Sequence, residues 1–302
     1  MKAVRIHERG GELVLEEAPY PHAAENDVIV KVRAAGFTPG ELTWPGTWVD
    51  RAGRDRAPTV PGHEVSGEVA ELGLGTTGLS VGQRVFGLTD WGRDGTLAEY
   101  VAVEARNLAP LPATIGHAEG AALPLAGLTA WQALFVHGRV EAGRTVLVHG
   151  AAGGVGSLAV QLARDAGARV IGTGRARDRS TALELGADAF VDLAAERFED
   201  AGQVDVVLDV IGGEVLARSA AVVRPGGTLV TVAEPLTVLP ENGRGVFFVV
   251  EPDRAQLAEL ARRVHEGRLR PLIGGVRPLA EAADAFRTKQ GTPGKVVLEV
   301  AP

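Results

Sequence analysis

The stretch TVLVHGAAGGVGSLAVQLARDAG, residues 145–167, decides the fold of this 302-residue chain. Thr145–Val148 is a short β-branched and apolar run that predicts a buried strand. A glycine-rich turn follows at once, and then a helix-forming run that Gly167 ends. The start of such a helix offers unpaired N–H groups and a positive dipole end to a pyrophosphate. We therefore predict a dinucleotide site at Gly150, Ala151, Ala152, Gly153, Gly154, Val155 and Gly156. A tight turn without a ligand is the alternative, since Ala151 interrupts the usual glycine pattern.

The segment after this helix predicts which dinucleotide binds. Arg169–Thr173 is typical of a second strand, which makes the unit a parallel βαβ. A site that prefers NAD needs Asp or Glu near that strand's end, about 20 residues past the glycines. The chain reads Thr173-Gly174-Arg175-Ala176-Arg177 there, and an arginine can pair with a 2′-phosphate. Arg175 and Arg177, with Thr173 and Gly174 beside them, therefore predict NADPH; a solvated arginine-rich surface loop is the alternative.

Composition excludes several classes of protein. The chain is 45% hydrophobic and 23% charged, which is typical of a globular protein large enough for two domains. Its net charge of −7 argues against a nucleic-acid-binding surface, and no apolar run is long enough to span a membrane. It has no cysteine, which excludes disulfides, thiolate catalysis and cysteine-bound zinc. Because the first residues lack a signal-peptide core, we expect a cytoplasmic location.

The first part of the chain, residues 1–117, predicts a partly closed β structure of the barrel type. Short strands with glycine and proline punctuation are expected at Val28–Ala34, Glu64–Gly73, Gly82–Gly87 and Leu97–Val103. Residues 44–61, rich in Trp, Pro, Gly and Arg, are expected to form a long loop.

Residues 118–267 predict a doubly wound α/β domain. Beyond the first βαβ unit we expect strands at Ala189–Val191, Val204–Val210 and Thr228–Val232, a helix at 214–223 and an amphipathic helix at Asp253–Gly267. The tail Gly294–Val300 predicts a strand that resembles the strands expected in residues 1–117. Residues 268–302 are therefore expected to rejoin residues 1–117 in one domain.

Motifs spread along the chain resemble one family. They are Gly62-His63-Glu64 with Gly67, Leu123–Trp131, Gly150–Gly156, Leu185–Asp188, Asp205–Gly213 and Gly294–Val297. In this order they are similar to the medium-chain dehydrogenase/reductase superfamily, in its zinc-independent quinone oxidoreductase-like branch. The resemblance implies a split GroES-like catalytic domain with a Rossmann domain inserted in it and NADPH between them.

The metal ligands of zinc-dependent relatives are mostly replaced. Where those relatives carry cysteines, this chain has Thr38 and a residue near Leu125, and His63 alone remains of the three ligands. One imidazole does not hold zinc, so no metal is expected. His63 is expected to be a hydrogen-bonded structural residue, with a role as ligand or acid as the alternative.

The resemblance also implies a set of site residues. Thr38 and Thr129 would lie near the nicotinamide, and Val210 and Ile211 beside the adenosine. The nicotinamide end would be lined by Val232, Ala233, Phe247, Phe248 and Val249, each of which could instead be plain core. From the residues themselves, the best candidates for a flat substrate wall are Trp44, Trp48 and Trp91, with structural loop anchors as the alternative.

These features predict an NADPH-dependent, zinc-independent oxidoreductase that transfers hydride to a quinone or an enone. Two alternatives stay open: a biosynthetic enoyl or ene reductase with one dedicated substrate, and a non-catalytic NADPH-binding protein. The apolar run Gly245–Val250 is expected to be the last strand of the cofactor domain and to pair across a homodimer. A central strand covered by its own helices is the alternative for that run.

Overall fold

The computed structural model describes residues 1–288 and 293–300. The chain forms two compact units. The first unit comprises Met1–Leu125, Pro252–His265 and Ile273–Pro302, and the second comprises Ala126–Glu251 and Glu266–Leu272. The domain boundaries expected from the sequence stay a prediction. Within the described part of the chain, no helix combines the length and apolarity needed to cross a membrane.

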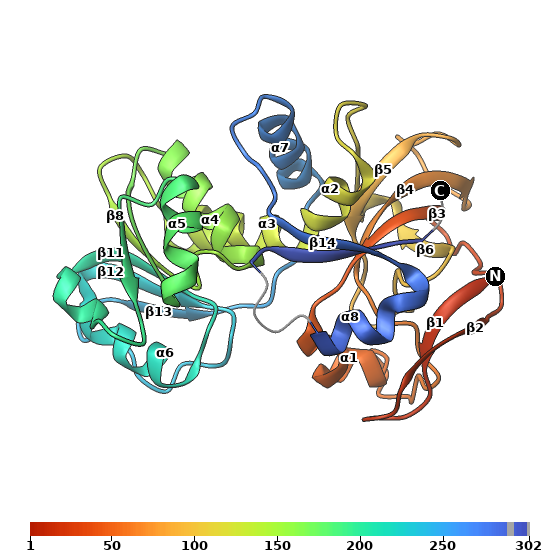
Figure 1. Ribbon diagram of the computed structural model, residues 1–302. Coiled ribbons are helices and arrows are strands. Elements are labelled where there is room, and N and C mark those ends of the chain that lie inside the picture. Colours follow the sequence, from red (N-terminus) through yellow and green to blue (C-terminus); the bar gives the residue numbers. More distant parts are fainter. Residues whose placement is uncertain (289–292, 301–302) are drawn as a thin grey trace. The chain divides into compact units, whose positions relative to one another are not determined.

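The second unit is built on a six-stranded parallel sheet (Figure 1). Its strands are β8 (Thr145–His149), β9 (Arg169–Gly174), β10 (Ala189–Asp192), β11 (Val204–Asp209), β12 (Val223–Thr231) and β13 (Arg244–Phe247). Their spatial order is β10-β9-β8-β11-β12-β13, so the chain moves outward from β8 to one edge, returns beside β8 and moves to the other edge. This is the 3-2-1-4-5-6 order of a doubly wound dinucleotide-binding sheet, and the predicted α/β class is confirmed.

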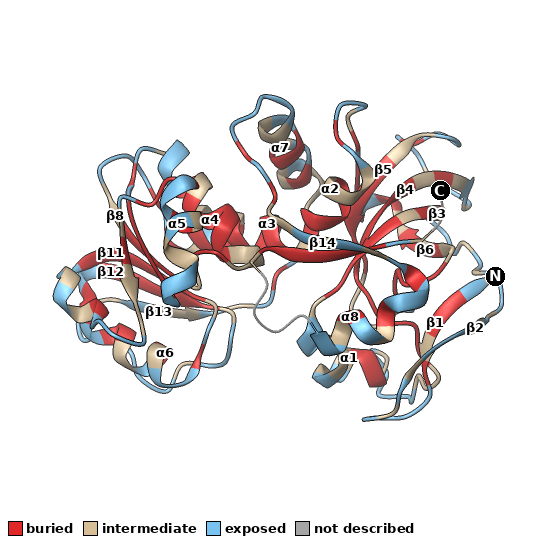
Figure 2. Ribbon diagram, in the orientation of Figure 1, coloured by how far each residue is buried: buried red, intermediate tan, exposed pale blue. Residues whose placement is uncertain are grey.

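Helices precede the first strand of this sheet and alternate with the later ones. They are α3 (Pro124–Trp131), α4 (Gly154–Asp165), α5 (Arg179–Glu184) and α6 (Gly213–Ser219), with short helical turns at Gln132–His137, Ala176–Asp178, Phe198–Ala201 and Ala220–Val222. Strand register places Leu147, Ile171, Val207 and Leu229 in one row, where they form a core cluster with Leu216 of α6. Figure 2 shows the central strands as mostly buried. Strands buried in this way explain the near-continuous apolar runs in the sequence.

The first unit contains a seven-stranded sheet centred on β3 (Asp27–Gly36). The other members are β4 (Glu64–Leu72), β5 (Arg84–Leu88), β6 (Tyr100–Glu104), β7 (Leu108–Pro110), β14 (Ile273–Pro278) and β15 (Lys295–Glu299). β15 pairs antiparallel with β3, so this strand near the C-terminus belongs to the sheet of the first unit. β1 (Lys2–Ile6) and β2 (Leu13–Glu17) form a separate hairpin, and the helices are α1 (Pro45–Trp48), α2 (His117–Ala122), α7 (Arg254–His265) and α8 (Ala282–Thr288).

Several expectations about individual elements need correction. Residues 44–61 are not loop throughout, because Pro45 starts the short helix α1. The helix expected at 214–223 ends at Ser219 and continues as a tighter turn. The strand expected at 245–250 is β13, Arg244–Phe247, and it lies at the edge of its sheet, so the alternative of a central strand is wrong.

Candidate active site

The residues predicted to bind the cofactor follow the carboxyl ends of five strands in the second unit. Because all six strands are parallel, those ends share one edge of the sheet. The glycine turn, residues 150–156, follows β8, and β8 lies where the winding direction reverses. Ligands of open α/β sheets bind in the crevice outside the strand ends at this switch point.

The glycine turn fits a pyrophosphate. A Cβ at Gly156 would lie 2.1 Å from the Gly150 carbonyl oxygen, so this glycine permits the close approach of α4 to the turn. Gly150 itself has a φ of 75°, a backbone conformation that is unfavourable for residues with a side chain. At Gly153 a Cβ would meet the Gly150 oxygen at 3.2 Å and nothing closer. In the described part of the chain, no side chain caps α4. The first helical hydrogen bond runs from the Ser157 N–H to the Gly153 carbonyl, so the N–H groups of residues 154–156 are available to an anion.

The end of β9 presents arginines rather than a carboxylate. Arg175 is exposed, and no ion-pair partner for its guanidinium occurs among residues 1–288 and 293–300. Arg177 is 53% exposed, with its Nε 3.9 Å from Asp178 Oδ1. Asp178 is the first acid after β9, and its Oδ2 accepts the Arg175 backbone N–H at 3.0 Å. Thr173 is fully buried; its hydroxyl contacts His149 Nδ1 at 2.8 Å, so its side chain supports the turn from inside.

The ends of β11, β12 and β13 carry the remaining predicted residues. Val210 and Val232 are half-buried, whereas Ile211, Phe247 and Val249 are 46%, 42% and 63% exposed. Ala233 is exposed, and the half-buried Phe248 packs its ring on His137 with 4.5 Å between centroids. Exposed apolar side chains at this edge are unusual for a plain core.

The shape of the edge after β11 is set by the buried Asp209. Its carboxylate accepts the backbone N–H groups of Ile211 and Gly212 and the hydroxyl of Thr231. Burial raises the pKa of this carboxyl, and these hydrogen bonds act in the opposite direction.

In the first unit, Glu41 organises the turn that carries Thr38. Glu41 is 1% exposed, and its Oε1 accepts the Gly62 N–H at 2.7 Å while its Oε2 accepts the Thr38 N–H at 3.2 Å. His63, the next residue along from Gly62, is 4% exposed, with its Nδ1 3.6 Å from Glu41 Oε2. That Nδ1 has no hydrogen-bond partner in the described residues, so the expectation of a hydrogen-bonded structural histidine is wrong for this atom.

Two of the three predicted tryptophans meet beside His63. The Trp91 ring lies 4.7 Å from the His63 ring, and Trp44 contacts Trp91 edge-on at 5.3 Å. Trp44, His63 and Trp91 form what we call the aromatic cluster. Trp48 is placed differently: it is buried, donates its indole N–H to the Leu42 carbonyl at 2.7 Å and lies under Arg9. These contacts are those of a loop anchor.

Comparison with known proteins identifies the family. The model of the alcohol dehydrogenase GroES-like domain matches residues 24–113, and that of the zinc-binding dehydrogenases matches residues 185–298. The quinone oxidoreductase of Rattus norvegicus is 30% identical over an alignment that covers 99% of this chain and 97% of the relative. The chain belongs to the medium-chain dehydrogenase/reductase superfamily, in its quinone oxidoreductase-like branch.

Two further similarities fix the class of protein. The NADPH-dependent alkenal/one oxidoreductase of Arabidopsis thaliana, a chloroplastic protein, is 34% identical to this chain. The alignment covers 100% of this chain and 80% of the relative. The quinone oxidoreductase of Thermus thermophilus, solved also in complex with NADPH, is 35% identical with a TM-score of 0.79 over 99% of this chain and 100% of its own. This superfamily member is therefore an oxidoreductase with a GroES-like and a Rossmann domain.

The positions that bind zinc in other members of the superfamily hold unsuitable side chains here. Thr38 and Leu125 have backbone N–H groups engaged by Glu41 and Glu64, and neither supplies a thiolate. In the described part of the chain, no three His, Cys, Asp or Glu side chains are grouped to hold a metal ion. Thr129, the other predicted catalytic residue, is buried in α3.

The structure also brings forward a residue to which the sequence assigns no role. Glu41 belongs to the turn Thr38-Pro39-Gly40-Glu41, where only Thr38 is predicted to act. The available signal was an acid three residues after Thr38, a spacing at which a side chain reaches back to a backbone N–H.

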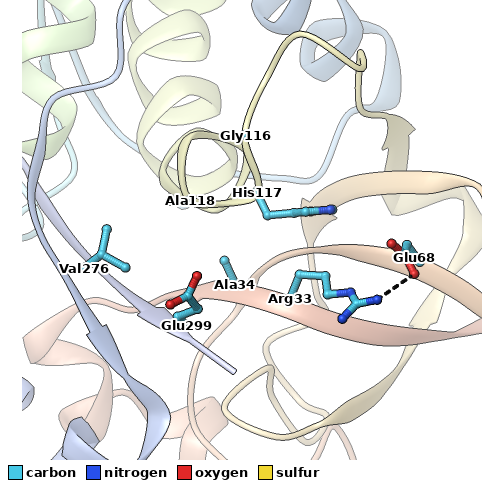
Figure 3. Close-up of a pocket in the computed structure, with 8 residues that line it drawn as sticks. All are labelled: Arg33, Ala34, Glu68, Gly116, His117, Ala118, Val276 and Glu299. Carbon is cyan, nitrogen blue, oxygen red and sulfur yellow. Dashed lines mark hydrogen bonds and ion pairs between the residues drawn. The ribbon is translucent and has the colours of Figure 1, made fainter. Parts of the chain in front are cut away.

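A separate cavity of about 530 Å³ lies in the first unit and contains none of the predicted site residues (Figure 3). The Arg33 guanidinium pairs with Glu68 at 3.2 Å, and His117 Nδ1 contacts the Ser66 hydroxyl at 2.8 Å. Burial and the nearby Arg84 lower the pKa of His117. Arg33 and Glu68 thus pair with each other, and His117 is held by a residue outside the lining.

Proposed function

We propose that the protein is an NADPH-dependent reductase that transfers hydride to a quinone or to an α,β-unsaturated carbonyl compound. The observation that carries this proposal is the convergence of the glycine turn, Arg175 and Arg177, and the exposed apolar residues at one sheet edge. Relatives named for quinones and alkenals support the substrate class. Because the family consists of oxidoreductases, the non-catalytic alternative is set aside.

The preference for NADPH over NADH rests on charge at the end of β9. A 2′-phosphate there would meet the exposed guanidinium groups of Arg175 and Arg177. An NADH site would need a carboxylate facing the ribose, and Asp178 instead caps the Arg175 N–H.

The side chains and backbone of this protein would bind and orient the reactants. NADPH would supply the hydride. The turn amides after Gly153 would hold the pyrophosphate, and Ile211, Phe247 and Val249 would cover the apolar parts of the cofactor. Trp44 and Trp91 meet edge-on rather than as one flat wall, and their rings would contact a conjugated substrate. Thr38 and Thr129 stay predicted polar contacts of the cofactor or substrate.

Steady-state NADPH oxidation with a panel of quinones and enones tests this proposal. We expect turnover with several conjugated carbonyls and none with the matching saturated ketones. Product analysis should show a reduced C=C bond or a hydroquinone. Turnover of the saturated ketones instead, or a preference for NADH, would contradict the proposal.

We also propose a homodimer formed through β13. Among the residues that the structure describes, no strand pairs with the outer side of β13, and an exposed edge invites pairing with a second copy. Val246→Arg should shift the mass seen in sedimentation equilibrium from dimer toward monomer. A wild-type protein that stays monomeric at micromolar concentration would exclude this assembly.

A further inference from the structure

Partnerless polar atoms gather around one short segment of the first unit. In the described residues, three buried side-chain atoms lack a hydrogen-bond partner: His63 Nδ1, Thr89 Oγ1 and Thr96 Oγ1. The backbone N–H of Thr89 binds the His63 carbonyl at 2.8 Å, and that of Thr96 binds the Gly62 carbonyl at 3.0 Å. All three atoms thus belong to His63 or to residues hydrogen-bonded to the segment 62–63. Unsatisfied buried groups are few in native proteins, and functional sites are one place where they persist.

The imidazole of His63 lies beside the carboxylate of Glu41, whose orientation is fixed by hydrogen bonds. Glu41 is held at both oxygens, by the N–H groups of Gly62 and Thr38. Its Oε2 is 3.6 Å from His63 Nδ1, just outside hydrogen-bond distance, and both side chains are almost completely buried. A fixed carboxylate beside one ring nitrogen orients the imidazole and with it the second nitrogen, Nε2.

Aromatic rings surround this pair. Trp91 and Trp44 lie 4.7 Å and 6.1 Å from the His63 ring, and the loops that carry them are tied together by Arg56. The Arg56 guanidinium donates to the Gly46 and Trp91 carbonyls and pairs with Asp94. The loops that carry the two rings are therefore held together, and aromatic side chains of this kind suit contact with a planar conjugated group.

We propose that His63, oriented by Glu41, is the hydrogen-bond donor to the carbonyl oxygen of the substrate. This inference rests on the proposed function. The substrate gains two electrons with the hydride that NADPH supplies, so NADPH becomes NADP⁺ and negative charge reaches the carbonyl oxygen. His63 Nε2–H donates to that oxygen, passes it a proton and regains one from water. The product is the hydroquinone, or for an enone the enol, which tautomerises in water to the saturated carbonyl compound. His63 would thus provide the electrophilic assistance that zinc provides in metal-dependent relatives.

Kinetics of three variants test the role of His63. His63→Leu should lower kcat about 100-fold with little change in KM, because one donor to the developing oxyanion is lost. His63→Gln, which keeps an N–H donor, should recover part of that loss, and Glu41→Gln should show a smaller decrease. His117→Gln is the matched control, a half-buried histidine of the same unit outside the aromatic cluster, and should retain wild-type kcat.

A binding measurement without turnover makes the test independent of activity. p-Nitrophenol is a planar phenol whose ionised form places negative charge on an oxygen conjugated to a ring. Wild-type protein and His117→Gln should bind the ionised form about tenfold tighter than the neutral form, and His63→Leu and Glu41→Gln should lose that preference. Quenching of tryptophan fluorescence, weaker in Trp91→Phe, would locate the phenol at the aromatic cluster.

The outcomes separate the two proposals. If p-nitrophenolate binding depends on His63 but no quinone or enone is reduced, the oxyanion site stands and the proposed function fails. If the wild-type protein is active while folded His63→Leu and Glu41→Gln keep its kcat and its affinity for the phenolate, His63 does not serve as the donor. Should His63→Leu fail to fold, unchanged phenolate binding in Glu41→Gln would overturn the proposal by itself.

Discussion

The strand-end edge of the second unit and the aromatic cluster of the first unit are built in different ways. At the edge, the regular backbone determines the positions of the site residues: parallel strands end together, and a glycine turn and a helix follow β8. At the cluster, Trp44, His63 and Trp91 come from three irregular segments, and side-chain hydrogen bonds from Glu41 and Arg56 fix their places. A site made from backbone tolerates many side-chain changes, whereas a site made from loops depends on a few buried contacts.

The two regions offer groups that suit different tasks, the edge for cofactor binding and the cluster for recognition and reaction of the substrate. The edge offers N–H groups, arginines and apolar surface, which suit a large anionic cofactor and are shared by many reactions. The cluster offers one imidazole and two indoles, with the Glu41 carboxylate beside the imidazole, and these groups can discriminate between substrates.

The largest effect is expected at the glycine turn. Gly153→Val should weaken dinucleotide binding at least about 100-fold, because the side chain would fill the space in which the pyrophosphate meets the turn amides. The fold should survive, since a Cβ there meets only the Gly150 oxygen, at 3.2 Å. Fluorescence titration with NADPH measures the affinity, and circular dichroism measures the fold.

Gly156→Val is the matched control for the fold. Its Cβ would lie 2.1 Å from the Gly150 oxygen, so α4 must move and thermal stability should fall sharply. Normal NADPH affinity in a folded Gly153→Val protein would mean that the turn does not hold the phosphates.

An effect of similar size for the pair, but specific to one cofactor, is expected from the arginines after β9. Replacing Arg175 and Arg177 with alanine should weaken NADPH binding about tenfold or more per side chain, because a charge-assisted hydrogen bond contributes roughly 1.5–3 kcal/mol. NADH binding should hardly change. The comparison of both dissociation constants in wild type and double variant gives the answer, with Arg169→Ala, an exposed arginine at the start of β9, as control. An equal loss for the two cofactors would count against 2′-phosphate recognition.

The same contrast explains how much of each region could be predicted from the sequence. The edge was predictable because periodic apolar runs, one glycine turn and the missing acid after β9 are all local in sequence. The cluster was not, because the Glu41 bond to the Gly62 N–H spans 21 residues of irregular chain. Trp44 and Trp48 occupy one segment and read alike, yet the indole of Trp48 binds the Leu42 carbonyl and Trp44 contacts Trp91. Burial of His63 without a partner at Nδ1 is a tertiary property that no spacing indicates.

A moderate, pH-dependent effect on stability is expected in the second unit. His149 lies in β8 with its ring nitrogens contacting the hydroxyls of Thr173 and Ser219 at 2.8 and 2.9 Å. Burial lowers its pKa from 6.5 to about 3, so the folded protein keeps this ring neutral. The unfolded chain binds a proton below pH 6.5, so the contribution is complete above that pH and is lost as pH falls toward 3.

The expected loss between pH 6.5 and pH 5 is about 2 kcal/mol from this histidine. Chemical unfolding of wild type and His149→Gln at several pH values measures it. The variant should be less stable at pH 7 and should show a shallower dependence on pH. His22→Gln, which changes an exposed histidine, should follow the wild type. Identical pH slopes for wild type and His149→Gln would show that His149 titrates alike in both states.

The smallest effect, none at all, is expected from removal of metal, and this prediction concerns the cluster. Thr38 and Leu125 offer no thiolate at the positions where zinc-dependent relatives carry cysteine. His63 and Glu41 together supply at most two ligands, and both Glu41 oxygens already accept backbone N–H groups. Tetrahedral zinc needs at least three protein ligands in a catalytic site, so prolonged chelation should leave kcat unchanged. A zinc-dependent member of the superfamily, treated in parallel, should lose its activity. Stoichiometric zinc in the purified protein, with activity lost on chelation and restored by zinc, would show instead that the cluster is a metal site and that His63 is one of its ligands.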